Sequence, residues 1–231
     1  MSAFGVVGKL PAPNLTPMLI RKVIPELLDH LPADDPAARR SRRDLRRINF
    51  LMGNERWVCR TLRRFPEAAG RGIVEIGAGD GKLCEKIARL FPQSSVAAYD
   101  LAPVPADLRS QVAWHRGDIF TMPPAAPGGV RIANLFLHHF EGKSLAALGR
   151  WLGNADLLVF NEPDRARLPH LLGALMHPWI NSVTRHDMHV SITAGFAAGE
   201  IPRLLGLDPT VWSFRETSTW RGARRVIGWR S

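Results

Sequence analysis

The stretch Val74–Lys82, VEIGAGDGK, decides the fold class of this chain. A short apolar run ends in three glycines with the spacing Gly-x-Gly-x-Gly, and a helical pattern follows at once. Glycines let a backbone turn sharply and approach a ligand with no Cβ in the way, and the first N–H groups of a helix are unpaired. Such loops also occur for structural reasons alone, so the neighbouring residues must decide what this one binds.

Beyond this loop, short apolar segments alternate with helical patterns. We predict strands at residues 72–77, 95–100, 112–116, 129–136 and 156–162, and helices at about 81–91, 142–152 and 165–177. The alternation indicates parallel strands with helices on both faces of one sheet. Two further strands, at 211–216 and 223–229, have no helix between them and predict a terminal antiparallel hairpin. The expected fold class is therefore α/β, a Rossmann-like doubly wound seven-stranded sheet.

The N-terminal third has a wholly helical pattern. Residues 16–30 carry apolar side chains on one face and predict an amphipathic helix that is interrupted near Pro25. Residues 41–65 continue at helical spacing, with a break at Gly53–Asn54. We therefore predict two parts, an N-terminal helical cap at 1–69 and an α/β domain at 70–231.

Composition limits the kind of protein. With 231 residues, 45% of them hydrophobic, the chain can bury one α/β core. Its two cysteines, Cys59 and Cys84, lie far apart in helical segments, which argues against a disulfide framework and favours the cytoplasm. No apolar run is long enough to span a membrane, so we expect a soluble protein.

The net charge of +10 is concentrated in the N-terminal third, where ten arginines lie between Arg39 and Arg64. Such a block attracts RNA or an anionic substrate. These arginines alternate with the apolar stripe and do not interrupt it, so a solvated helix face explains them equally well. The sequence leaves these alternatives open.

Two acidic residues follow the glycine loop at the ends of the next two strands. Asp100 ends the strand at 95–100, where a carboxylate can accept both hydroxyls of a ribose, and Asp118 follows the strand at 112–116. The loop lacks the Gly-x-Gly-x-x-Gly of nicotinamide dinucleotide enzymes, and Asp80 within it would repel a pyrophosphate. No Gly-Lys-Ser/Thr follows, which disfavours a phosphate-loop NTPase. The combination favours a nucleoside cofactor that carries an amino group and a sulfonium cation.

These motifs resemble those of the class I S-adenosylmethionine-dependent methyltransferases. VEIGAGDGKLCEKIA is similar to the family's first motif, AAYDLAP to the second, RGDIF to the third and IANLFLHHF to the fourth. The resemblance covers about residues 70–231. It implies S-adenosyl-L-methionine as the cofactor and methyl transfer as the activity. The whole chain is also similar, more weakly, to small-molecule methyltransferases of bacterial specialised metabolism.

The resemblance also implies which residues bind the cofactor. The glycine loop would line the methionine moiety, Asp100 the ribose and Asp118 with Ile119 the adenine, while Asn134 and Leu135 would lie beneath the sulfonium. The implied set is Glu75, Gly77, Ala78, Gly79, Asp80, Gly81, Asp100, Leu101, Asp118, Ile119, Asn134 and Leu135.

Two adjacent histidines, His138 and His139, follow the fourth strand and are candidate catalytic bases. An imidazole suits removal of a proton from a phenol, whose pKa is ~10. They could equally shape the loop. We predict no metal site, because adjacent histidines are expected to point apart and no third ligand is near in sequence.

A second polar cluster, TRHDMHVSIT at 184–193, contains a possible acid–base pair, His186 and Asp187, or else residues of a surface helix. Glu162 ends the fifth strand and faces the same edge, where it could bind substrate or close a turn.

The leading hypothesis is methyl transfer to a small aromatic or quinone-like acceptor, at oxygen or alternatively at carbon. An RNA or ribosome-directed methyltransferase that uses the basic helices is the second, which makes nucleic acid the less favoured partner. A non-catalytic binding module with the same fold is the third.

Overall fold

The computed structural model describes residues 20–32, 34–108 and 111–230. Its centre is one seven-stranded sheet with the order β3-β2-β1-β4-β5-β7-β6. The strands are β1 (Ile73–Ile76), β2 (Val96–Asp100), β3 (Val112–Arg116), β4 (Val130–Asn134), β5 (Leu157–Pro163), β6 (Trp212–Ser218) and β7 (Ala223–Arg230). β1 to β5 pair in parallel, whereas β7 pairs antiparallel with both β5 and β6. The predicted α/β class and the terminal hairpin are confirmed.

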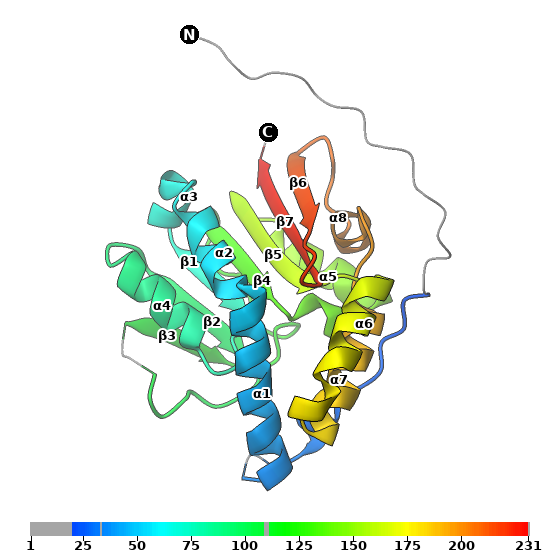
Figure 1. Cartoon of the computed structure of the whole chain (residues 1–231). Coiled ribbons are helices and arrows are strands. Elements are labelled where there is room, and N and C mark those ends of the chain that lie inside the picture. Colours follow the sequence, from blue (N-terminus) through cyan, green and yellow to red (C-terminus); the bar gives the residue numbers. More distant parts are fainter. Residues whose placement is uncertain (1–19, 33, 109–110, 231) are drawn as a thin grey trace.

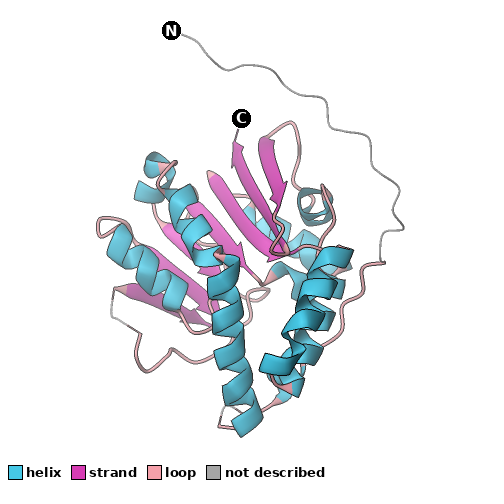
Figure 2. Cartoon of the chain, in the orientation of Figure 1, coloured by secondary structure: helices cyan, strands magenta, loops and turns pink. Residues whose placement is uncertain are grey.

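Helices cover both faces of this sheet, as Figure 2 shows. One face carries α2 (Asn54–Leu62), α3 (Pro66–Gly70) and α4 (Lys82–Leu90), and the other carries α5 (Gly142–Leu152) and α8 (Glu200–Leu205). Successive residues of a strand point to opposite faces. Ile73 therefore joins the core under α2 and α4, while Val74 joins the core under α5 and α8. Burial on both faces explains why these strands are apolar nearly throughout.

A helical cap lies beyond the edge where the parallel strands end (Figure 1). One wall is α1 (Pro36–Met52), and the other is built by α6 (Arg167–Met176), the short η3 (His177–Trp179) and α7 (Ser182–Ala194). Asp44 of α1 is buried and accepts hydrogen bonds from Asn181 N (3.1 Å) and Thr184 Oγ1 (3.3 Å). These bonds join the two walls.

The helix α1 begins and ends as its sequence indicates. Asp35 Oδ1 accepts hydrogen bonds from the N–H groups of Ala37 and Ala38 (2.7 and 3.0 Å), and Pro36 takes the first helical position. Gly53 ends the helix with a φ of 70°, so the predicted break at Gly53–Asn54 is confirmed. Because α2 packs in the sheet's own core while α1 reaches beyond it, the domain boundary at residues 69 and 70 stays a prediction.

The amphipathic helix predicted for residues 16–30 is wrong where the structure describes it. Residues 20–26 have no regular secondary structure, and only η1 (Leu27–His30) forms a 3-10 turn; residues 16–19 lie outside the described ranges. Pro25 removes a backbone donor. The N–H groups of Leu27 and Leu28 instead bind the Asp187 carboxylate on α7 (2.7 and 3.0 Å). Tertiary hydrogen bonds thus replace those of a helix.

Candidate functional site

The glycine loop between β1 and α4 needs glycine for two different reasons. Gly77, Gly79 and Gly81 all have positive φ values (66°, 57° and 69°), which other residues adopt only with strain. A Cβ on Gly77 would also lie 2.0 Å from Cδ2 of Phe136. At Gly79, by contrast, no described atom lies within 4 Å of such a Cβ. The loop is therefore tightly packed at its start and open at its middle.

Asp100, at the end of β2, fixes the open part of the loop. Its Oδ2 accepts a hydrogen bond from Gly79 N and its Oδ1 accepts one from Ala102 N, both at 2.8 Å. An ionised carboxylate has about four acceptor sites, so two remain for a ligand's hydroxyl groups. Leu101 beside it is exposed. The structure therefore brings Asp100 onto the glycine loop, and its predicted contact with a ribose stays a prediction.

The two other predicted acids lie in turns. Asp80 Oδ1 accepts a hydrogen bond from Lys82 N (3.3 Å), at the start of α4. Asp118 is exposed and accepts a hydrogen bond from Phe120 N (2.9 Å), while Ile119 between them is buried. Both carboxylates have turn-forming roles in this state, and their cofactor roles stay predictions.

Glu75, in the middle of β1, is buried beneath the loop. Cys84 Sγ donates a hydrogen bond to its Oε2 (2.9 Å). Burial, with the negative charge of Asp80 adding to it, raises the pKa of Glu75 to about 8 despite this bond. The carboxyl group is therefore mostly neutral at pH 7 in this state.

The end of β4 carries backbone strain. Leu135 has a φ of 58° and is the only described non-glycine residue with a positive φ. Its N–H donates to Asn161 O (2.8 Å), and the Asn161 side chain donates to Asn134 Oδ1 (2.9 Å). The neighbouring strand β5 thus holds this turn in place.

Glu162 of β5 organises the residues that follow. It is fully buried, and its two oxygens accept hydrogen bonds from the N–H groups of Phe136 (3.0 Å), Leu137 (2.8 Å) and His138 (3.3 Å). A fourth contact joins Oε2 to Nδ1 of His138 at 2.8 Å. Because an ionised carboxylate only accepts, Nδ1 carries the proton. The sequence placed Glu162 at this edge but gave no sign that it binds a whole turn.

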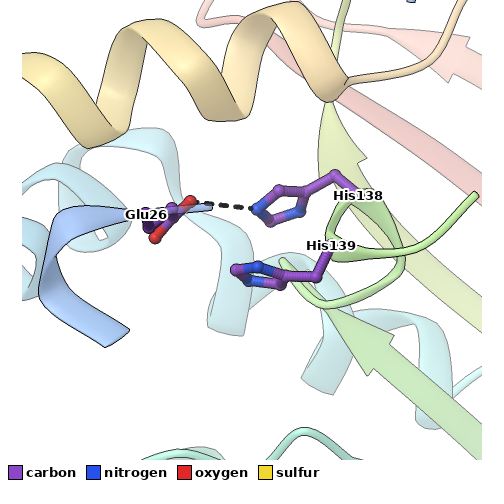
Figure 3. Close-up of side chains that lie close together, drawn as sticks. All are labelled: Glu26, His138 and His139. Atoms are coloured by element: carbon purple, nitrogen blue, oxygen red, sulfur yellow. Dashed lines mark ion pairs between the residues drawn. The ribbon is translucent and has the colours of Figure 1, made fainter. Parts of the chain in front are cut away.

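His138 lies between the carboxylates of Glu162 and Glu26. Figure 3 shows its contact with Glu26. Its Nε2 lies 3.5 Å from Oε1 of Glu26, which also accepts a hydrogen bond from Ser191. Burial opposes the charged imidazole, but the hydrogen bonds and charges of Glu162 and Glu26 outweigh it and raise the pKa of His138 to about 9. The imidazole is therefore charged at neutral pH in this state.

His139 has a different environment. Its side chain is 31% exposed, and its Nδ1 lies 3.9 Å from Oδ2 of Asp29. Burial and the neighbouring His138 lower the pKa of His139. Neutral imidazole is thus favoured here.

One of the two reasons for expecting no metal site is wrong, because the adjacent histidine side chains do not point apart. His138 and His139 lie in a 3-10 turn, η2 (Leu137–His139), and their ring centroids are only 4.3 Å apart. Together with Glu26 they offer three possible ligand atoms within 4.8 Å of one another. Nδ1 of His138 contacts Glu162 and its Nε2 contacts Glu26, and the absence of a metal site stays a prediction.

His186 and Asp187 lie on α7, where the sequence placed a possible surface helix. Asp187 is buried and binds the N–H groups at the start of η1, while Nδ1 of His186 lies 3.0 Å from its Oδ1. The geometry of Asp187 is that of a positioning residue, because it holds the segment that carries Glu26.

Sequence reasoning missed the contribution of the segment before α1. Glu26 contacts His138, and Arg21 Nη2 donates to the backbone oxygens of Phe140 (2.7 Å) and His138 (3.3 Å). More than 110 positions separate these partners, so no local pattern could reveal them.

Comparison with known proteins agrees with this architecture. No protein-family model matches the chain. Acetylserotonin O-methyltransferase of Rattus norvegicus is 37% identical over 153 residues, covering 62% of this chain and 33% of the relative. Trans-aconitate 2-methyltransferase of Methylobacterium nodulans is 28% identical over 130 residues, covering 53% of this chain and 50% of the relative. The matches thus span a third to a half of these curated relatives.

A solved structure extends the likeness to nearly the whole fold. The plantazolicin methyltransferase BpumL, in complex with a pentazolic desmethylPZN analog and SAH, has a TM-score of 0.68 at 13% identity, covering 85% of this chain and 92% of that one. At this identity the likeness concerns the fold. The chain therefore has the class I methyltransferase fold, and the resemblance expected from its sequence is confirmed.

Proposed function

We propose that this chain transfers a methyl group from S-adenosylmethionine to an oxygen atom of a small aromatic or quinone-like acceptor. The observation that carries the proposal is the 2.8 Å hydrogen bond between Gly79 N and Asp100. It holds the open glycine loop beside the carboxylate that we expect to bind the ribose hydroxyls. The names of the relatives support it, because acetylserotonin O-methyltransferase methylates at oxygen by its name.

The residues of this edge fit the cofactor. The open space at Gly79 admits a ligand close to the backbone, and Asp100 keeps acceptor sites for two hydroxyls. S-adenosylmethionine supplies an electrophilic methyl group when bound. Glu75 can help hold its amino end only after losing its proton, which an approaching ammonium group favours.

We assign the base role to His138, with Glu162 as its positioning residue. Since Glu162 holds the proton on Nδ1, the basic atom is Nε2, which faces Glu26 and the cap. General-base catalysis is most efficient when the pKa of the base lies near the working pH. The pKa of about 9 at His138 lies above neutral pH, so only a minor fraction is neutral, but it is close to the ~10 of a phenol, which favours transfer of the proton to that fraction.

His139 is the second candidate for the base. Its imidazole is partly exposed, lies beside Asp29 and has a lowered pKa, so it is neutral without further change. The two histidines differ in their starting protonation state, because the charged His138 must lose a proton before it can accept one from the acceptor.

Calorimetric titration with S-adenosylhomocysteine tests the cofactor assignment. We expect the unaltered protein to bind and Asp100→Ala to bind at least tenfold more weakly. Asp208→Ala is the matched control, because this exposed carboxylate only closes a turn at Thr210. No binding by any form, or equal affinity for Asp100→Ala, would overturn the assignment and favour a binding module of another specificity.

Transfer of a tritiated methyl group to a panel of phenols tests the base. We expect His138→Ala to lose about a hundredfold in turnover and His139→Ala less than tenfold, in line with typical general-base contributions. The reverse order assigns the base to His139. Full turnover in both variants would show that no histidine base is used.

The location and the role of the cap belong to the same proposal. Among the described residues, none of the helices has the length and apolar character that crossing a bilayer requires. Cys59 and Cys84 are both free and buried, which supports the cytoplasm. We propose that α1, the described part of the predicted N-terminal cap that reaches beyond the sheet, encloses the acceptor together with α6 and α7.

A further inference from the structure

A second functional feature lies outside this site, on the surface of α1. Its arginines point to solvent on the sides that do not pack against α7, and beyond them Phe50 and Leu51 are 77% and 60% exposed. The exposed arginines of this helix are Arg39, Arg40, Arg43, Arg46 and Arg47.

The helix α6 adds an apolar stripe. Leu168, Leu171 and Leu175 recur at helical spacing on one side and are 48%, 60% and 61% exposed. Trp179, just beyond the helix, is 77% exposed. A helix of a soluble domain ordinarily turns such a stripe to the core, and a large exposed apolar patch marks an interaction site.

The turn between β6 and β7 connects the two helices. Trp220 is 68% exposed, with the Arg221 guanidinium 4.8 Å from its ring, and Arg221 Nη1 donates to Leu51 O (3.0 Å). On the other side, a Cβ on Gly222 would lie 3.0 Å from Pro169 of α6. Figure 1 shows this turn between the C-terminal end of α1 and the start of α6. We call this combined surface the arginine–leucine face.

The charge of this face has a single sign. Asp44, the one acidic residue of α1, is buried against α7. Residues 167–179 and 219–222 contain no aspartate or glutamate. A second copy docked symmetrically here would oppose arginine to arginine, which disfavours self-association. A nucleic acid would match the arginines but would leave the leucine stripe in water.

We propose that the arginine–leucine face docks the protein onto an anionic lipid surface. The arginines pair with headgroup phosphates, while the leucines enter the boundary between headgroups and acyl chains. Trp179 and Trp220 suit that boundary as well, since tryptophan is enriched at membrane interfaces. The proposal goes beyond methyl transfer and does not depend on it, because no residue of the histidine cluster or the glycine loop takes part.

Flotation of the purified protein with vesicles tests the docking. We expect strong binding to phosphatidylcholine vesicles that contain phosphatidylglycerol, at least tenfold weaker binding to phosphatidylcholine alone, and weakening as salt rises. The double variant Arg43→Ala, Arg47→Ala should bind the anionic vesicles roughly 25-fold more weakly. Each arginine near such a surface contributes about a fivefold factor.

The apolar half needs its own variant. Leu171→Ser with Leu175→Ser should also weaken vesicle binding severalfold, but should leave its dependence on salt unchanged. Arg150→Ala and Leu90→Ser, at exposed positions of α5 and α4, are the matched controls and should bind like the unaltered protein. Circular dichroism melting of every variant verifies that the fold is kept.

Each contrary result overturns the proposal. Absence of binding to the anionic vesicles does so directly. Binding of a uridine oligonucleotide that only the arginine variant reduces would make the face a nucleic-acid footprint. If the protein does not bind vesicles but forms dimers in sedimentation, and the leucine variant abolishes those dimers, the face is a protein–protein contact. Equal binding to neutral and anionic vesicles would remove the role of the arginines.

Discussion

The two ends of the candidate site are built in different ways. At the glycine loop, the geometry depends mainly on the glycines within Glu75–Lys82, with Asp100 on Gly79 and the Phe136 ring on Gly77 as contacts from further along the chain. At the histidine turn, His138 depends on Glu26 and Glu162, and Glu26 depends in turn on Asp187. The backbone conformation of the glycine loop thus depends mainly on nearby sequence, whereas the charge of His138 depends on carboxylates from distant segments.

The largest effect is expected from Glu162→Ala. This change leaves three backbone N–H groups unpaired and removes the carboxylate that binds Nδ1 of the buried His138. Breaking a buried charged pair costs about 3–5 kcal/mol of unfolding free energy. Urea unfolding measures it, with Glu55→Ala as the control, since that exposed pair with Lys86 should contribute under about 1 kcal/mol. Similar losses in both variants would contradict a special role for Glu162.

The same difference explains how far sequence reasoning reached. The glycine spacing, the strand-ending Asp100 and the terminal hairpin follow from short-range patterns, so the fold could be predicted. The break at Gly53 has a local cause for the same reason. The conformation of residues 20–30 depends on Asp187, some 160 positions away, and the orientation of His138 and His139 depends on a turn held by Glu162. Local helical spacing therefore predicted a helix at residues 20–26 where none forms.

A pair of glycine variants should separate packing from binding within the loop. In Gly77→Ala the new side chain must adopt a left-handed φ and also clashes with the Phe136 ring. We therefore expect a loss of about 3 kcal/mol in the free energy of unfolding. Gly79→Ala meets only the φ, at a cost of about 1 kcal/mol, but puts its methyl group into the open space proposed for the cofactor. Gly79→Ala should therefore lose more S-adenosylhomocysteine affinity per kcal/mol of stability lost. Parallel losses in the two variants would argue against a ligand at Gly79.

The raised pKa of His138 predicts opposite pH trends for activity and stability. Its folded pKa of about 9 exceeds the unfolded value of ~6.5, so its stabilising effect is complete below pH 6.5 and is lost as pH rises through 9. Turnover at low acceptor concentration should instead rise about tenfold per pH unit from pH 7 to 8 and level off near 9, because the neutral base is the active form.

Replacing Glu26, the carboxylate near Nε2 of His138, tests the same pKa more sharply. Glu26→Gln removes one of the two charges that raise the pKa, so the activity profile should move to lower pH. Glu141→Gln changes an exposed carboxylate that does not contribute to the pKa shift of His138, and it should leave the profile in place. If Glu26→Gln has no effect on the profile, the rate does not report His138, and the base is His139 or absent.

The smallest effect is expected at the pair that the sequence suggested as catalytic. Asp187→Ala frees two N–H groups of η1, at a cost of about 1–2 kcal/mol, and loosens the segment that carries Glu26. The activity profile should therefore move in the same direction as in Glu26→Gln, by a smaller amount, which a purely structural defect would not cause. His186→Ala should leave both turnover and profile within twofold, because its imidazole contacts only Asp187 among the carboxylates of the described chain. A loss of turnover in His186→Ala with an unshifted profile would instead restore His186 and Asp187 as an acid–base pair, and would move the chemistry from the histidine turn to α7.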